Sequence, residues 1–324
     1  MLVFKPQLVA GPIERAANLL PQFYKRRKFE YHKAVDGLRQ ILWGLFKKVV
    51  IADNCAEYVD QIFSNSGELN GSSLVIGLLF FSFQAYGDFS GYSDIAIGTS
   101  RLFGFNLMKN FSYPFFARDI AEFWRKWHIS LMTWFRDYIY IPLGGSRVKK
   151  SRYIFNVFIV FLISGLWHGA NWTYVLFGAI HGLYFMPLLL FKNNRANLDI
   201  IAENRVLPTF RELRLMIYTF ALVNFSWILF RAEDLSHSIS IFKKIFSLSF
   251  FQFPDFDGLK GSLIIFVMVS IFICIEWVSR KDEYGIEKFG SNWKKPFRYG
   301  FYYIIILLIL LYVGKEEQFI YFQF

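Results

Sequence analysis

Five stretches of this chain are long, apolar and almost free of charge. They run over residues 154–167, 172–191, 215–230, 263–275 and 299–313. About 20 apolar residues in a helix span the hydrocarbon core of a bilayer, and flanking tolerant residues extend the shorter runs. Hydrophobic residues make up 55% of the chain, above the usual share in soluble domains. The sequence therefore predicts an all-α integral membrane protein, a multi-helix transmembrane bundle.

The rest of the chain fits one membrane domain over residues 1–324, since it holds no internal repeat and no flexible linker. We expect a basic cytoplasmic segment over 1–35, an amphipathic or spanning helix over 36–52 and a long apolar helix over 72–99. Residues 101–151 mix aromatic and charged side chains, which predicts re-entrant or interfacial helices, because irregular backbone at membrane depth must be buried by protein or face water. Residues 152–191 are expected to form a helix pair.

The formal charge of +11 is distributed over alternate connecting segments. Basic residues are dense in 15–39, 101–152, 192–214 and 280–298, whereas 53–71 carries acidic residues and neither Lys nor Arg. The positive-inside rule places the basic segments in the cytoplasm, and 169–171 and 231–260 then face outward. Insertion into a lipid bilayer therefore accounts for the positive charge, and no nucleic-acid partner is expected.

Several kinds of chemistry lack their sequence signature. The two cysteines have no metal-ligand or redox spacing, so no metal site is expected. The chain contains neither a phosphate-binding glycine loop nor a dinucleotide fingerprint, and no serine lies in a nucleophile-elbow motif. We therefore expect no bound cofactor, and direct attack by an acceptor hydroxyl is simpler than a covalent enzyme intermediate.

His181 is the most informative of the five histidines. It lies at the centre of the 172–191 helix, roughly 15 Å from either end and near the bilayer midplane. An ionisable group at that depth is costly and suggests a functional site, and a neutral imidazole can serve as general base toward a hydroxyl. A buried histidine bonded to a neighbouring helix would explain the position equally well.

His168 and Asn171 mark the connection before that helix. Gly169 suits a helix C-terminus and Asn171 suits the N-cap of the next helix, so two antiparallel helices are expected here. His168 then lies at the outer turn, half a membrane from His181. A structural or entrance-lining role for His168 is favoured over a catalytic one.

His128 belongs to an aromatic segment, 123–135. If this segment is one helix, Trp124, Trp127, His128, Leu131 and Phe135 share an apolar face, with Glu122 and Lys126 on the other side. His128 would then point into the bundle. From the pattern alone, a core histidine with satisfied hydrogen bonds is the preferred interpretation.

Asp88 and Asp94 place two carboxylates in the apolar 72–99 helix, where each costs roughly 2.5–3.5 kcal/mol at mid-helix. Pairing with a buried arginine such as Arg101, Arg118 or Arg125 is the favoured interpretation. Orienting a histidine or lining a polar tunnel is the alternative. Gly87 and Gly91 beside them are spaced for close helix packing.

Several of these segments together resemble the membrane-bound O-acyltransferase family, specifically its bacterial alginate O-acetylation branch. The matching segments, in order, are 6–15, 86–94, 123–131, 134–145, 166–172 and 178–182. Related members transfer D-alanine toward teichoic acid, but the residues at 9–15 and 167–172 resemble the acetylating branch more. Members usually carry more helices before the first motif, so the resemblance implies a chain lacking the usual N-terminal helices.

The resemblance implies a helical bundle around a tunnel in a bacterial cytoplasmic membrane. It implies an acyl thioester, acetyl-CoA or acyl carrier protein, as cytoplasmic donor substrate, and an extracytoplasmic acetyltransferase or carrier protein as partner. The family's essential histidine falls on His181 and its second histidine on His128. For the charge on the thioester carbonyl, Asn171 and His128 are candidate hydrogen-bond donors.

We therefore hypothesise O-acetyl transfer from a cytoplasmic thioester to a cell-surface polysaccharide or an extracytoplasmic carrier, with His181 as general base or hydroxyl-orienting group. Two alternatives belong to other classes. One is a transporter of polysaccharide or acyl intermediates. The sequence shows no inverted repeat, which disfavours this alternative. The other is a non-catalytic membrane scaffold that binds partner proteins.

Overall fold

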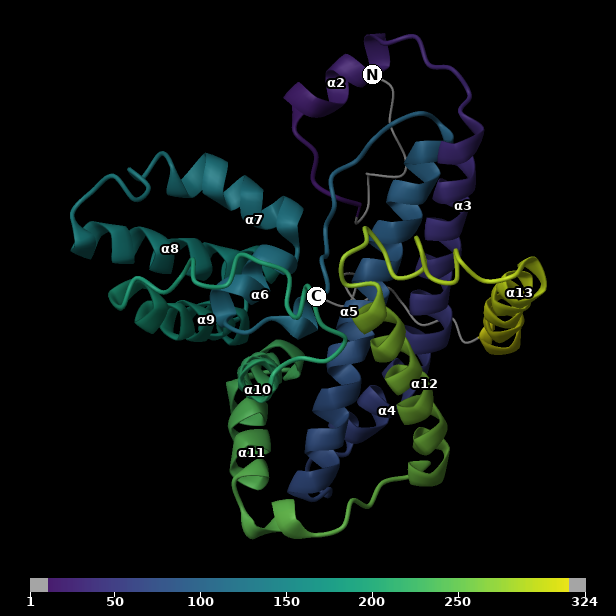
Figure 1. The fold of residues 1–324 in the computed structure, drawn as a ribbon. Coiled ribbons are helices and arrows are strands. Elements are labelled where there is room, and N and C mark those ends of the chain that lie inside the picture. Colours follow the sequence, from purple (N-terminus) through teal and green to yellow (C-terminus); the bar gives the residue numbers. More distant parts are fainter. Residues whose placement is uncertain (1–10, 315–324) are drawn as a thin grey trace. The chain divides into compact units, whose positions relative to one another are not determined.

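The computed structural model describes residues 11–314 and shows helices and connecting segments, with no strand in that range (Figure 1). Residues 1–10 of the predicted basic segment, and with them part of the 6–15 motif, lie outside the described residues. The helices are α2 (Ala16–Tyr24), α3 (Tyr31–Leu45), α4 (Asp53–Ser64), α5 (Gly71–Leu102), α6 (Ile120–Lys126), α7 (Ile129–Phe135), α8 (Lys150–His168), α9 (Trp172–Leu190), α10 (Phe210–Arg231), α11 (Leu235–Ile245), α12 (Leu259–Val278) and α13 (Lys295–Tyr312). Two π-helical segments, η1 (Phe46–Ala52) and η3 (Arg136–Tyr140), continue α3 and α7, and η2 (Pro114–Phe116) and η4 (Leu248–Phe251) are short 3-10 turns.

Six of these helices are long and apolar enough to cross a membrane, namely α5, α8, α9, α10, α12 and α13. They confirm the five apolar runs and the 72–99 helix, and differ from the predicted bounds by a few residues at the ends. The all-α fold class is confirmed as well.

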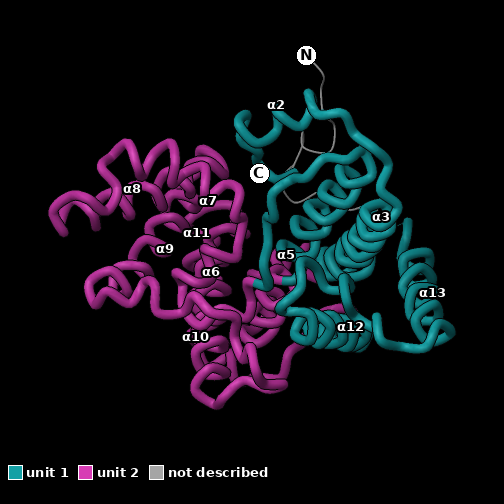
Figure 2. The backbone as a smooth tube through the Cα atoms, turned by 45° about the horizontal axis from the view of Figure 1, so that its top comes forward, with its two compact units in different colours: residues 1–57, 83–113, 260–323 teal, residues 58–82, 114–259, 324 magenta. Residues whose placement is uncertain are grey.

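The chain divides into two compact units (Figure 2). Unit 1 comprises the described parts of 1–57, 83–113 and 260–323, and unit 2 comprises 58–82 and 114–259. Helices α4 and α5 contribute to both units. The single membrane domain over 1–324 stays a prediction.

One connection predicted from the sequence is wrong. Residues 53–64 of the acidic 53–71 segment form helix α4, which follows η1 without a break. Cys55, Val59 and Ile62 recur at helical spacing and are buried, while Glu57 is exposed. Glu57 and the half-buried Asp60 lie on the polar face of an amphipathic helix, whereas Asp53 at its start is buried, and charge counting alone does not reveal this pattern.

Within unit 1, α3 and η1 pack closely against α5. A Cβ atom placed on Gly91 would lie 2.7 Å from the Gly44 carbonyl oxygen, and one on Gly87 would lie 3.0 Å from the Lys47 carbonyl oxygen. Both distances are too short for a larger side chain, so the glycines let the two backbones meet. The predicted close packing at Gly87 and Gly91 is confirmed.

Within unit 2, α8 and α9 form the antiparallel pair that the sequence predicts. A Cβ atom on Gly165 would lie 2.2 Å from the Tyr174 carbonyl oxygen, and one on Gly178 would lie 2.3 Å from the Phe161 carbonyl oxygen. The two helices therefore touch along their backbones three residues before His181. This contact fixes the height of His181 against α8.

Contacts within unit 2 bring three connecting segments together near the N-terminal end of α9. At its N-terminal end, the Asn171 amide donates to the Glu233 carbonyl at 3.0 Å, Arg231 pairs with Asp60 at 2.7 Å, and the Lys244 ammonium donates to the Leu69 carbonyl at 2.9 Å. The segments 169–171 and 231–260, both predicted to face outward, thus meet each other and the acidic 53–71 segment. Which end is cytoplasmic stays a prediction.

Candidate functional site

Residues 118–145 form a hairpin of short helices alongside α8 and α9, which we call the 118–145 hairpin. It starts beside the segment that follows α9, where the Arg118 guanidinium donates to the Asp199 carboxylate at 3.1 Å. At mid-height, Trp124 of α6 contacts Phe161 and His181. At its far point, the ring of His128 lies 5.8 Å from that of Trp167, near the C-terminus of α8.

The hairpin then returns to the end at which it began. The Asn156 amide, near the start of α8, donates to the Leu143 carbonyl at 3.0 Å and to the Gly145 carbonyl at 3.2 Å. The segment therefore enters and leaves at one end of the α8–α9 pair. Whether the segment is re-entrant or interfacial in a membrane stays a prediction.

The conditional prediction of one helix over 123–135 is wrong. Helix α6 ends at Lys126, Trp127 is extended, and His128 adopts a left-handed conformation with φ 45° and ψ 51° before α7 begins. Non-glycine residues rarely adopt this conformation, and here it reverses the chain at the tip of the hairpin. Trp124, Trp127, His128, Leu131 and Phe135 are nevertheless all buried, as the shared face predicted. Glu122, expected on the opposite side, is buried too, paired with Arg118 and Lys126.

His181 is fully buried, and both of its ring nitrogens have hydrogen-bond partners. The Trp124 indole N–H donates to His181 Nδ1 at 3.1 Å. The Ser226 hydroxyl oxygen of α10 lies 2.8 Å from His181 Nε2. Three helices, α6, α9 and α10, therefore meet at this one imidazole.

Aromatic rings surround the His181 imidazole on several sides. The ring centroids of Phe177, Trp124, Tyr184 and Phe123 lie 4.6, 4.9, 5.8 and 6.4 Å from that of His181. These contacts fix the plane of the imidazole and keep it out of water. A fixed orientation and a dry surrounding are what a group acting on a hydroxyl or a thioester needs.

His128 and His168 lie on the Trp167 side of His181. The ring of His168 contacts Trp167 and Phe177, and Phe177 also contacts His181. Aromatic side chains thus link His128, His168 and His181 into one cluster. Burial lowers the pKa of His128 well below its usual value, with a smaller contribution from His168, so the His128 ring is neutral at physiological pH.

Asn171 caps α9, as the sequence predicts. Its side-chain oxygen accepts from the Thr173 backbone N–H at 3.1 Å, and its amide donates to the Glu233 carbonyl. Both ends of the amide therefore have structural partners. This arrangement makes Asn171 less suited than His128 to stabilise a developing charge.

Asp88 and Asp94 are paired, but with lysines and not with the arginines named above. Lys47 lies 2.7 Å from the Asp94 carboxylate, and Lys48 lies 2.8 Å from the Asp88 carboxylate. The two lysines are consecutive residues of η1, the part of the predicted 36–52 helix that packs against α5. Arg101 pairs with Asp36 and Arg118 with Glu122. Both lysines and both aspartates belong to unit 1, where the two carboxylates serve as ion-pair partners.

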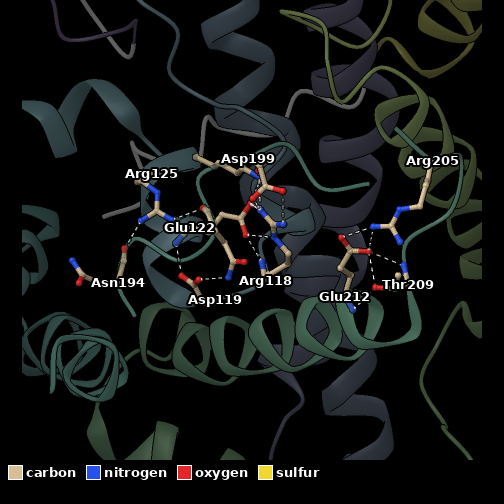
Figure 3. A network of polar contacts seen from close by, with 11 residues as sticks. Arg118, Asp119, Glu122, Arg125, Asn194, Asp199, Arg205, Thr209 and Glu212 are labelled. Atoms are coloured by element: carbon tan, nitrogen blue, oxygen red, sulfur yellow. Dashed lines mark hydrogen bonds and ion pairs between the residues drawn. The ribbon is translucent and has the colours of Figure 1, made fainter. Parts of the chain in front are cut away.

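A polar network holds the start of the hairpin against the segment after α9 (Figure 3). Arg118 joins Glu122 to Asp199, and the Arg125 guanidinium donates to the carbonyls of Asn194 and Asn197 at 2.8 Å each. The Arg118 guanidinium holds the pKa of Asp199 below its usual value. Because α6 carries Trp124, this network also fixes the residue that bonds to His181.

Two residues of the site were not identified as functional from the sequence. Trp124 belongs to a motif noted above, but its spacing only marked it as apolar. Ser226 lies in the apolar α10 helix, and a polar side chain in such a run was the one signal that could have drawn attention to it.

Comparison with known proteins places this sequence in a family. A sequence model of the membrane-bound O-acyltransferase family matches residues 2–229, which include the 118–145 hairpin, His181 and Ser226. The chain belongs to the membrane-bound O-acyltransferase family. The match reaches past residue 182, where the resemblance noted from the motifs ended.

Several curated proteins are similar in sequence to this chain. A probable alginate O-acetylase of Pseudomonas aeruginosa is 39% identical over 273 residues, covering 82% of this chain and 50% of that protein. A peptidoglycan O-acetyltransferase of Helicobacter pylori is 38% identical over 248 residues, covering 76% of this chain and 46% of that protein. A teichoic acid D-alanyltransferase of Streptococcus thermophilus is 30% identical over 200 residues, covering 56% and 47%. The chain spans about half the length of these relatives.

Membership in a membrane-bound family agrees with the six apolar helices and makes the chain a multi-pass membrane protein. Among residues 11–314, no group of three or more His, Cys, Asp or Glu side chains is arranged to hold a metal ion.

Proposed function

We propose that this chain takes part in acyl transfer, most simply acetyl transfer, from a cytoplasmic thioester to a hydroxyl at the outer face of a bacterial cytoplasmic membrane. The donor would be acetyl-CoA or an acyl carrier protein. The acceptor would be a cell-surface polysaccharide, or an extracytoplasmic acetyltransferase or carrier protein that passes the group on. The named activities of the alginate, peptidoglycan and teichoic acid relatives support this class of reaction.

The observation that carries the proposal is the position of His181. A fully buried imidazole at the centre of a membrane-length helix, held in a fixed orientation by partners from two other helices, is the kind of ionisable group that suggests a functional site in a membrane protein. In the reaction, the acceptor oxygen bonds to the acyl carbon, the carbon–sulfur bond breaks, and the hydroxyl proton ends on the released thiol. His181 is the group proposed to act on that hydroxyl.

A donor must also stabilise the negative charge that develops on the thioester oxygen. We assign this role to His128, whose neutral ring carries one N–H donor. Its place at the tip of the hairpin, beside Trp167 and in the same aromatic cluster as His181, supports the assignment.

Thioester consumption separates acyl transfer from the two alternatives. Membranes containing the chain and its native acceptor system are supplied with labelled acetyl-CoA or labelled acetyl–acyl carrier protein. Acyl transfer predicts that thiol is released and that the label enters the polysaccharide fraction in step, with the better donor identified by comparing the two arms. Movement of polysaccharide with no thioester consumed would favour a transporter. Partner binding that survives His181→Ala, again with no thioester consumed, would favour a scaffold.

A further inference from the structure

A basic cavity lies in unit 1, where the start of α3 meets the C-terminal end of α5. It has a volume of about 210 Å³ and is lined by residues 27–30, 33–34 and 101–104. The charged side chains of the lining are the cations of Arg27, Lys28, Lys33 and Arg101 and the carboxylate of Glu30. The lining therefore has a net charge of +3, and counting Asp36, which pairs with Arg101 from outside the lining, still leaves +2.

The Arg27 guanidinium is held in one position by its neighbours. It donates to the Gln22 carbonyl at 3.1 Å, and its central carbon lies 4.4 Å from the centroid of the Phe105 ring. The Gln22 side chain in turn exchanges two hydrogen bonds with the Asn106 backbone, at 2.8 and 3.0 Å. A guanidinium has five N–H donors in a planar fork that matches a phosphate group, and the bond to Gln22 uses one of them. Arg27 is therefore a preorganised phosphate-binding group in the lining.

Arg101, in the last turn of α5, is the second arginine of the lining. It pairs with the Asp36 carboxylate, which also accepts a hydrogen bond from the Tyr284 hydroxyl at 2.6 Å. These contacts fix the Arg101 guanidinium at the end of a helix that is long and apolar enough to cross a membrane. The cavity therefore lies where a spanning helix leaves the hydrocarbon, at the level of the lipid headgroups.

Exposed aromatic side chains accompany these cations. Phe29 and Phe103 belong to the lining, and Tyr24 and Tyr31 lie in the same stretch of chain as Phe29. All four side chains are more than half exposed. Apolar rings beside Lys and Arg are typical of surfaces that lie in the interface of an anionic bilayer. The combination favours a lipid over a soluble phosphate compound as the ligand of the cavity.

We propose that this cavity between α3 and α5 binds the phosphate headgroup of an anionic phospholipid. Arg27 and Arg101 bind the phosphate oxygens, because both guanidinium groups are already held in place. Lys28 and Lys33 add positive charge around the phosphate, and the two lining phenylalanines contact the start of the acyl chains. The bound anion offsets the mutual repulsion of the four cations. The proposal does not depend on acyl transfer or on His181.

Native mass spectrometry of the full chain in detergent measures lipid binding, in titrations with phosphatidylglycerol or with phosphatidylcholine of the same acyl chains. The wild type should bind the anionic phosphatidylglycerol about fivefold more tightly or better. Arg27→Gln combined with Lys28→Gln should weaken phosphatidylglycerol binding about tenfold or more, because two cations of the lining are lost. Lys25→Gln combined with Arg26→Gln removes the same charge from exposed neighbours outside the lining, and should weaken binding less than about threefold.

Glu30→Gln is a change whose expected effect misfolding cannot imitate. It removes the carboxylate of the lining, which pairs with Lys33 at 2.7 Å, so phosphatidylglycerol should bind about threefold more tightly. Glu68→Gln removes an exposed carboxylate from unit 2 and should leave the affinity unchanged.

Three results would overturn the proposal: equal affinity for the two lipids, equal losses in the two double variants, or no gain with Glu30→Gln. Coenzyme A provides the test for a soluble ligand. At the concentration of the lipid it should not displace phosphatidylglycerol from the wild type. Displacement would assign the cavity to a soluble phosphate compound and overturn the lipid assignment.

Discussion

Replacing His181 by glutamine lowers the rate of acyl transfer by about a hundredfold to ten-thousandfold, the range that a positioned group acting on a proton contributes. Glutamine is close to histidine in length and can still form hydrogen bonds, so the neighbouring helices stay packed. It has no ring nitrogen that can take up a proton, so it cannot serve as general base toward the acceptor hydroxyl. The measurement is transfer of labelled acyl group at saturating donor, per amount of folded chain in the membrane.

His32→Gln is the matched control for this change. His32 is exposed, so its replacement should leave transfer and folding as they are. Size-exclusion profiles of the solubilised variants show whether each is folded. A folded His181→Gln variant whose rate stays within a factor of ten of the wild type would remove His181 from the chemistry.

Replacing Lys47 by methionine destabilises unit 1 by about 3–5 kcal/mol, as expected when one member of a buried ion cluster is removed. Lys47 is buried, lies 2.7 Å from Asp94 and 3.6 Å from Glu276, and donates to the Ser90 hydroxyl at 3.2 Å. Methionine fills a similar volume but leaves two buried carboxylates without this cation. Thermal unfolding of the chain in detergent, followed by tryptophan fluorescence, measures the loss.

Two further variants show whether charge or volume causes this loss. Lys33→Met removes an exposed lysine paired with Glu30 and should change stability by less than about 1 kcal/mol. Adding Asp94→Asn to Lys47→Met removes one of the stranded carboxylates and should recover part of the loss. If the double variant is no more stable than the single one, the ion cluster is not the reason for the effect.

The membrane helices could be predicted because length and hydropathy alone decide them. Each run in 154–167, 172–191 and the later segments became a helix with nearly the predicted ends. The Asn171 cap and the depth of His181 also follow from local rules, since both depend on a single helix and its turn. Residues whose position depends only on their own helix could therefore be predicted from the sequence.

Contacts with residues from other helices could not be predicted from the sequence. Lysines from η1, and not arginines, pair with Asp88 and Asp94, because the close glycine contacts bring η1 against α5. The chain reversal at His128 depends on packing between α8 and the hairpin, and no glycine or proline marks it. The bonds from Trp124 and Ser226 to His181 join residues 57 and 45 positions apart, a separation that no periodicity reports.

We propose that this chain moves acyl groups to the cell surface through His181. The most direct test of this proposal is the O-acetyl content of surface polysaccharide in cells that lack the native gene and carry either this chain or its His181→Gln variant. We expect acetylation to return with the chain and to be absent with the variant, at equal amounts of both in the membrane. Equal acetylation from the two, or none from either, would contradict it.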